Sequence, residues 1–315
     1  MAKASKEMMQ VSSISEISED MKPTVVTIGK FDALHLGHQQ LISATIEIAE
    51  EHMLIPTLLT FDRHPEEILQ NSEAPLPVIG PNQKRNLVAE AGIELMVSLT
   101  FDDTLANLTA EDFVQRVLVD GLAAKVVVIG EEFRFGAGAK GDVGLLKELG
   151  EQLGFMVRVI PAVEANGRRI STSWIRELLL QGEVVAVSKL LGRWHATEGM
   201  VEHGLKIGRE IGFPTANMAR DAEGFLPRDA VYAGWLYADG ERYPAALSVG
   251  INETFTAVPR LLEAHIIDLR GIDLYDKVIT CEYVEFIRPA AKFNGVEDLV
   301  AEINRDLVKI REILG

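Results

Sequence analysis

The segment 24–38, TVVTIGKFDALHLGH, sets the architecture expected for the first half of the chain. Its β-branched residues predict a strand over 24–29, Gly29 begins a turn, and a helical apolar pattern follows over 41–51. The same alternation predicts strands over 54–61, 95–99, 125–130 and 155–161, and helices over 83–91, 110–119 and 143–153. Because strands separated by helices need crossover connections, we expect a mostly parallel α/β sheet covered on both faces.

The second half of the sequence has a different pattern. Alternating apolar runs over 231–238, 243–249, 261–269 and 278–287 follow one another without room for crossover helices, which is typical of an antiparallel sandwich or barrel. Apolar residues three and four apart predict a helix over 296–314 that docks on this sheet. We therefore predict two domains, 11–185 and 186–315, with 1–8 as an unstructured extension.

Composition limits the class of function. The 315 residues contain 31 Lys and Arg against 47 Asp and Glu, a net charge of −16, and so lack the basic footprint of nucleic-acid binding. No stretch has the pattern of a signal peptide or a membrane span. The single cysteine, Cys281, lies in an alternating apolar run and is predicted to be a buried thiol. We expect a cytoplasmic protein with no nucleic-acid or membrane partner.

Two histidines, His35 and His38, follow the Gly29 turn at the start of the first long helix. Residues three apart share a helix face, and a helix N-terminus offers free N–H groups and partial positive charge. Two imidazoles there form an anion site suited to polyphosphate and to the charge on a departing pyrophosphate. The alternatives are a helix cap with a core histidine, or a zinc site, for which no third ligand lies nearby in the sequence.

A second candidate phosphate contact lies at 171–176. Ser171, Thr172 and Ser173 precede a helical pattern, where hydroxyl groups cap the helix and can donate to phosphate. Arg176, on the next turn, adds a fixed fork of donors. A plain helix cap is the alternative for the hydroxyl groups.

The glycine-rich segment 204–217, GLKIGREIGFPTAN, carries the chemistry of the second half. Glycines with Lys206 and Arg209 between them describe a loop whose backbone amides can approach phosphates, although the order of a Walker A loop is absent. Thr215 and Asn217, two apart in an extended stretch, present oxygen atoms on one side, which suits Mg²⁺ carried with a nucleotide. A plain β-turn over 212–217 is the alternative.

These motifs together resemble one family, the bacterial bifunctional riboflavin kinases/FMN adenylyltransferases, also called FAD synthetases. The resemblance runs from about Val11 to Leu314. In the first half it rests on the turn 29–38, on Thr60-Phe61-Asp62-x-His64-Pro65, on Gly130-x-x-Phe133-x-Phe135-Gly136 with Gly141-Asp142, and on 170–176. In the second half it rests on Gly208-Arg209-x-x-Gly212-Phe213-Pro214-Thr215-Ala216-Asn217, on Gly250-x-Asn252-x-Thr254-Phe255, and on Glu263.

The resemblance implies a Rossmann-like nucleotidyltransferase domain followed by a β-barrel riboflavin kinase domain with a C-terminal helix. It implies that His35, His38 and Arg176 act on ATP in the first domain. In the second domain it implies that Glu263 is the base for the ribityl 5′-hydroxyl. The implied ATP-binding residues are Gly29, Phe31, Asp32, Gly37, Ser171, Thr172 and Ser173, then Gly204, Lys206, Gly208, Arg209, Gly212, Pro214 and Thr215. The implied flavin-binding residues are Asp62, Phe133, Phe135, Asn252, Thr254 and Phe255, and the implied metal ligands are Thr215 and Asn217.

Four residues depart from the family pattern near these positions. Lys30 stands where the family usually has an uncharged residue, and Ala33 where it has Gly. Arg63 stands where the family has Pro, and Glu132 where it has Asn or Asp. A carboxylate at Glu132 removes hydrogen-bond donors and repels phosphate unless Lys30 or Arg63 pairs with it.

The expected enzyme uses ATP and Mg²⁺ to convert riboflavin to FMN, and ATP and Mg²⁺ again to convert FMN to FAD and pyrophosphate. One alternative is a riboflavin kinase whose adenylyltransferase domain is weakened by the four departures. The other is a non-catalytic flavin- or nucleotide-binding sensor. Glu263 counts against the sensor, because binding alone does not need a base.

Overall fold

A computed structural model describes residues 7–63, 76–203, 211–250, 260–269 and 271–315. The chain forms two compact units, one made of Met1–Leu76 and Lys84–Ile170, the other of Pro77–Gln83 and Ser171–Gly315. The units divide at Ile170 because helices α7 (Thr172–Gln181) and α8 (Val184–Leu191) pack on each other and α8 contacts the second unit's sheet. The boundary of the catalytic domains between 185 and 186 stays a prediction.

The first unit is built on a parallel six-stranded sheet, as the α/β pattern predicts. All strand pairs of this sheet are parallel, and its strands lie in the order β1-β4-β3-β2-β5-β6. Their bounds are β1 Met9–Val11, β2 Thr24–Ile28, β3 Ile55–Phe61, β4 Leu95–Leu99, β5 Ala124–Gly130 and β6 Met156–Ile160. The carboxyl ends of these strands form the edge at which such sheets bind ligands.

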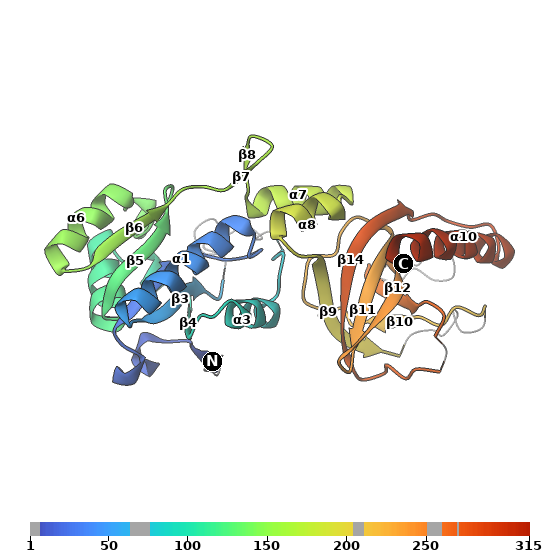
Figure 1. Ribbon diagram of the computed structural model, residues 1–315, viewed down its shortest axis with the longest axis horizontal. Helices are drawn as coiled ribbons and strands as arrows, with labels where there is room; N and C mark the ends of the chain where they lie inside the picture. Colours follow the sequence, from blue (N-terminus) through green and yellow to red (C-terminus); the bar gives the residue numbers. More distant parts are fainter. Residues whose placement is uncertain (1–6, 64–75, 204–210, 251–259, 270) are drawn as a thin grey trace. The chain divides into compact units, whose positions relative to one another are not determined.

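Helices cover both faces of this sheet (Figure 1). On one face Val25 and Val128 pack with Ala49 of α1 (Leu36–His52). On the other face Val26 and Ile28 pack with the remaining helices of the unit. These are α5 (Ala110–Phe113), its π-helical continuation η3 (Val114–Gly121) and α6 (Val143–Leu153). Successive residues of β2 thus enter opposite cores, which explains why all of its residues are buried.

The second unit is a closed antiparallel barrel with strand order β10-β13-β12-β11-β14-β9, which confirms the predicted barrel. The strands are β9 His195–Glu202, β10 Ala216–Met218, β11 Ala230–Ala238, β12 Glu241–Gly250, β13 Leu261–Ile266 and β14 Val278–Pro289. The predicted C-terminal helix is α10 (Val296–Leu314), which packs on the barrel through Leu307 and Ile310 (Figure 1). Cys281 is fully buried in β14, and burial raises the pKa of its thiol.

Short strands and one strand with an internal glycine account for the errors of the sequence prediction. The extension assigned to 1–8 is wrong at Met8, which is buried and leads into the edge strand β1. The sequence pattern also misses β1 and β10, which have only three residues each, and β9, which contains Gly199. Within the described ranges no helix is long and apolar enough to cross a membrane.

Candidate functional site

The turn after β2 brings His35 and His38 together at the start of α1. His35 is the N-cap of α1, and its Nδ1 atom accepts a hydrogen bond of 3.3 Å from the backbone N–H of His38. The two imidazole rings stack with 3.7 Å between their centroids. The capping interpretation of His35 is therefore correct, and the cap holds the His38 ring at the helix N-terminus, where an anion is most favourable.

Backbone conformation in this turn is unusual. Phe31 (φ 49°) and Leu34 (φ 45°) lie in the left-handed region, which is rare for bulky residues and typical of functional turns. A Cβ atom at Gly37 would lie 3.1 Å from the His35 ring, so glycine lets that ring pack against the backbone. Ala33 is buried but outside the left-handed region, so this turn has no need of the family's usual glycine there.

Lys84 of α3 (Pro81–Glu90) stabilises the same turn. Its ammonium group donates a 2.9 Å hydrogen bond to the carbonyl oxygen of Lys30, which also accepts one of 3.1 Å from the hydroxyl of Thr60. Burial lowers the pKa of Lys84, and the negative charge of Asp32 opposes that shift. The sequence pattern did not indicate a role for Lys84 in this turn, because Lys84 lies 54 positions after Lys30.

The charge of Glu132 is compensated by a residue that the sequence did not indicate. Glu132 forms an ion pair with Arg169, and not with Lys30 or Arg63, the two partners considered from the sequence. A two-stranded hairpin, β7 (Glu164–Ala165) and β8 (Arg168–Arg169), brings this arginine to Glu132. The positive charge of Arg169 therefore offsets the Glu132 carboxylate within the first unit.

The three predicted flavin-binding residues of this unit have internal contacts. Phe133 stacks on Phe135 with 5.5 Å between centroids, and Phe135 is buried beside Phe113. Asp62 accepts a 2.9 Å hydrogen bond from the backbone N–H of Phe101. Packing explains Phe135 fully, whereas Phe133 is half-buried. Flavin binding by these residues stays a prediction.

Ser171 confirms the capping alternative. It is the N-cap of α7, and its hydroxyl oxygen accepts a hydrogen bond of 3.3 Å from the backbone N–H of Trp174. Thr172, Ser173 and Arg176 follow in the first turns of the same helix. This run lies in the second compact unit and the histidine pair in the first, so a phosphate site that uses both stays a prediction.

In the second unit, the barrel presents Glu263 on its outer face. Its neighbours along β13, Leu262 and Ala264, are buried, so the alternation of a strand turns Glu263 the other way. Glu263 lies directly opposite Asn217 of β10 and Ser248 of β12. Because directly opposed residues share one face of a sheet, these three side chains form a polar row across the strands.

A cavity of about 680 Å³ adjoins this face of the barrel. Its polar lining includes Glu263, Ser248 and Thr215. Its apolar lining includes Ile303 and Leu307 of α10 and the aromatic side chains of Phe213 and Phe293. Glu263 is therefore not an ordinary solvated strand residue, because a helix covers the face on which it lies.

A second cavity, of about 540 Å³, is lined by Thr215, Asn217 and Tyr275. Thr215 lines both cavities. Among the described residues no group of three or more His, Cys, Asp or Glu side chains could hold a metal ion. Thr215, which lines both cavities, carries a hydroxyl oxygen, and Asn217, which lines the smaller one, carries a side-chain amide oxygen. Both are hard donors of the kind that Mg²⁺ accepts.

His265 is a site residue that was overlooked in the sequence. It lies two positions after Glu263, lines the larger cavity, and donates from Nδ1 to the Pro214 carbonyl oxygen at 2.8 Å. Burial lowers the pKa of its imidazole, and the bond to Pro214 opposes the shift. The alternation of β13 could have revealed it, because residues two apart share a strand face. The bond fixes the backbone beside Thr215.

Several predicted residues lie outside the described ranges. They are Gly204, Lys206, Gly208 and Arg209 of the glycine-rich loop, and Asn252, Thr254 and Phe255 of the flavin-binding set. Of the loop's predicted ATP-binding residues, the structure describes Gly212, Pro214 and Thr215.

Comparison with known proteins covers both units. The FAD synthetase family matches residues 17–174, and the riboflavin kinase family matches residues 191–314. The bifunctional riboflavin kinase/FMN adenylyltransferase of Escherichia coli (strain K12) is 33% identical over 292 residues, which are 92% of this chain and 93% of that protein. The chain belongs to the bifunctional riboflavin kinase/FMN adenylyltransferase family.

Further relatives agree with this family assignment and confirm the resemblance. The bifunctional riboflavin kinase/FMN adenylyltransferase of Listeria monocytogenes is 33% identical over 284 residues, 90% of each chain. A crystal structure described as a macrolide-efflux protein from Streptococcus pneumoniae is similar with a TM-score of 0.85 and 29% identity, covering 96% of this chain and 98% of that one. The order of a parallel sheet followed by a barrel is thus shared over nearly the whole chain.

Proposed function

We propose that this chain catalyses both reactions of its family. The second unit transfers the γ-phosphoryl group of ATP to riboflavin, giving FMN and ADP. The first unit transfers the adenylyl group of another ATP to FMN, giving FAD and pyrophosphate. Both family models and the relatives that carry both activities in their names support this assignment.

The observation that carries the kinase assignment is that Glu263 and Thr215 line the same cavity of the second unit, and that Thr215 also lines the smaller cavity. In the kinase step the 5′-hydroxyl oxygen of riboflavin bonds to the γ-phosphorus while the bond to the β,γ-bridging oxygen breaks. Glu263 accepts the hydroxyl proton. The acceptor hydroxyl and the γ-phosphoryl group then meet near Thr215, which lines both cavities.

The cavities suit two different ligands. The larger one has the size of a small-molecule site and aromatic side chains, Phe213 and Phe293, that fit a planar flavin ring. The smaller one contains Tyr275, on which the ring of His203 stacks with 4.0 Å between centroids. We assign riboflavin to the larger cavity and ATP to the smaller.

In the first unit a phosphate oxygen of FMN bonds to the α-phosphorus of ATP while the bond to the α,β-bridging oxygen breaks. His35 and His38 stabilise the charge that develops on pyrophosphate, at the N-terminus of α1. The stacked rings and the Lys84 contact hold this turn in place before the substrate arrives. A role of Arg176 and of the hydroxyl groups at 171–173, which lie in the second unit, stays a prediction.

Magnesium and the location of the enzyme are parts of the same proposal. Thr215 and Asn217 are the residues that would hold Mg²⁺, which keeps several waters and is bound largely through the phosphates of the nucleotide. When bound, the ion offsets negative charge on the phosphoryl oxygens. We expect the enzyme in the cytoplasm, with riboflavin, FMN and ATP as its small-molecule partners.

The test is chromatography of the products formed from riboflavin, ATP and MgCl₂. We expect FMN at early times and FAD later, with ADP and pyrophosphate as co-products. FMN without FAD would instead support a kinase with an inactive first unit. Binding of flavin without any product would support the sensor.

A further inference from the structure

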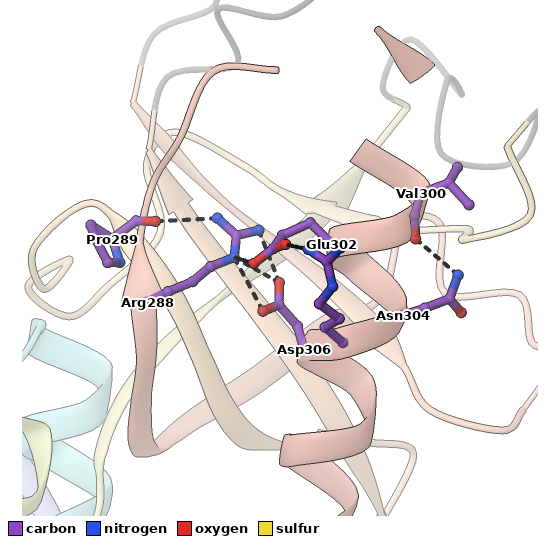
Figure 2. Close-up of polar contacts among 7 residues, drawn as sticks. Arg288, Pro289, Val300, Glu302, Asn304 and Asp306 are labelled. Atoms are coloured by element: carbon purple, nitrogen blue, oxygen red, sulfur yellow. Dashed lines mark hydrogen bonds and ion pairs between the residues drawn. The ribbon is translucent and has the colours of Figure 1, made fainter. Parts of the chain in front are cut away.

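Arg288, near the end of β14, contacts two separate parts of the larger cavity's wall (Figure 2). Its Nε atom lies 3.1 and 2.9 Å from the two carboxylate oxygens of Asp306 on α10, and Nη2 lies 2.9 Å from one of them. Its Nη1 atom donates to the Pro289 carbonyl oxygen at 3.2 Å. The guanidinium carbon lies 5.5 Å from the ring centroid of Phe293. One side chain thus joins α10 to the segment that precedes it.

The ion pair is well shielded from water. The side chains of Arg288 and Asp306 are 16% and 4% exposed. Burial raises the pKa of Asp306, and Arg288 opposes this shift. Glu302, one turn earlier on α10, is 3.7 Å from Arg288 and also pairs with Arg305 (Figure 2). Buried ion pairs add little stability compared with apolar packing. We therefore interpret this pair as a contact that fixes the position of α10 rather than as a source of stability.

The pair is part of the cavity itself. Arg288, Pro289, Phe293 and Asp306 all line it, as does Glu263 on the barrel face. The position of α10 therefore sets the width of the space beside Glu263. A rigid, planar ligand is sensitive to such a width, because a misplacement of about 1 Å is enough to change rates or affinities strongly.

We propose that Arg288 is a positioning residue for the flavin substrate. By holding Asp306 and the Pro289 carbonyl together, it sets the spacing between α10 and the barrel face that carries Glu263. This inference rests on the proposed kinase function, and it makes riboflavin affinity, rather than ATP affinity, the quantity that depends on the pair. Lys at this position keeps the charge but loses the two-point contact with Asp306.

The chain offers a matched control on the same helix. Arg311 of α10 forms an ion pair with Asp268, with donor–acceptor distances of 3.0 and 2.7 Å. Arg311 and Asp268 are not among the lining residues of the larger cavity. Arg311→Met therefore removes a tie between α10 and the rest of the unit without altering the cavity wall.

The experiment compares the full-length wild type with R288M, R288K, D306N and R311M. It measures the Kd of riboflavin by flavin fluorescence, the KM of riboflavin and of ATP, kcat, and urea unfolding. We expect the riboflavin Kd and KM to rise about tenfold in R288M and D306N and less in R288K, with the ATP KM within about twofold. In R311M every constant stays within about twofold of wild type.

Two results would overturn the inference. One is an unchanged riboflavin Kd in the folded variants. The other is a rise of the riboflavin Kd in R311M equal to that in R288M, which would make Arg288 one of several residues that merely attach α10 to the barrel. If R288M does not fold, R288K and D306N decide by the same criterion. A wild type that binds riboflavin but forms no FMN would refute the proposed function, while the Kd comparison would still decide the role of Arg288.

Discussion

Arg169 supplies the positive charge that offsets Glu132, although Arg169 lies on strand β8 and Glu132 in the turn after β5. Their side chains are 48% and 67% exposed, so water screens the pair and its contribution to stability is small. Its effect is on the local potential, because Arg169 places a positive charge next to the carboxylate of Glu132. The positive charge of Arg169 therefore opposes the repulsion that this carboxylate would exert on a phosphate.

Loss of Arg169 is expected to expose that charge. We expect R169M to lower the rate of FAD formation from FMN and to leave FMN formation unchanged. E132Q in the R169M background should recover part of the loss, since it removes the uncompensated carboxylate. The measurement is a double-mutant cycle on kcat/KM for FMN. Strict additivity of the two substitutions would show that the ion pair has no role in adenylylation.

Glu263→Ala is expected to abolish FMN formation while leaving FAD formation from supplied FMN intact. Glu263→Gln keeps the size of the side chain and should lower kcat of the kinase step by roughly 100-fold or more, as expected for removal of a general base. Glu285→Gln is the control, because Glu285 is exposed on β14. Product chromatography separates the two activities. Equal loss of both activities in a Glu263 variant would refute separate sites.

The histidine pair allows capping and catalysis to be separated. His35→Ala removes the N-cap of α1 and should cost about 1 kcal/mol of stability, whereas Asn is a good N-cap and His35→Asn should keep it. Both variants, and His38→Asn, are expected to lower FAD formation on the order of 100-fold. FMN formation from riboflavin should not change. An His35→Asn enzyme with normal FAD formation would limit His35 to the capping role.

Lys84→Met should weaken adenylylation without any direct contact to substrate. The Lys30 carbonyl loses its hydrogen bond from a charged donor. The free energy of such a bond corresponds to a decrease in FAD formation of about tenfold. The exposed Lys147→Met on α6 is the control. The ratio of kcat to KM for FMN and the unfolding free energy are measured together. Unchanged FAD formation in a folded Lys84→Met enzyme would show that the turn keeps its geometry unaided.

His195 makes the stability of the second unit depend on pH. Burial lowers the pKa of its imidazole from 6.5 to about 4, and its Nε2 atom donates a 2.6 Å hydrogen bond to the Phe225 carbonyl oxygen. As pH falls below 6.5, His195 binds a proton in the unfolded chain but stays neutral in the folded unit until the pH approaches about 4. Stability is therefore lost between pH 6.5 and about 4, by roughly 3 kcal/mol in total.

Tryptophan fluorescence during urea unfolding measures this effect, because Trp174, Trp194 and Trp235 all lie in the second unit. In His195→Gln the free energy of unfolding should fall less steeply over that pH range than it does in wild type. The exposed His52→Gln, in the first unit, should leave the slope unchanged. A wild-type slope that persists in His195→Gln would assign the acid sensitivity to other groups.

Local patterns predicted most elements of the fold. The strand over β2, the helix α10 and the change from crossover helices to consecutive strands are all visible as apolar periodicity, because each depends on residues close in sequence. The motifs around His35 and Glu263 were also recognisable, since each is a contiguous run of residues. The capping role of Ser171 followed from its position before a helical pattern.

Contacts between distant residues required the tertiary structure. Arg169 rather than Lys30 or Arg63 pairs with Glu132, Lys84 reaches the turn from α3, and Arg288 holds Asp306. None of these pairs shares a helix or a strand, so no periodicity connects them. Composition and periodicity determined that this chain is an α/β unit followed by a barrel, because burial of apolar side chains acts locally along each element. Chain packing alone decided which charges meet, because an ion pair depends on distances that strand register and helix docking set.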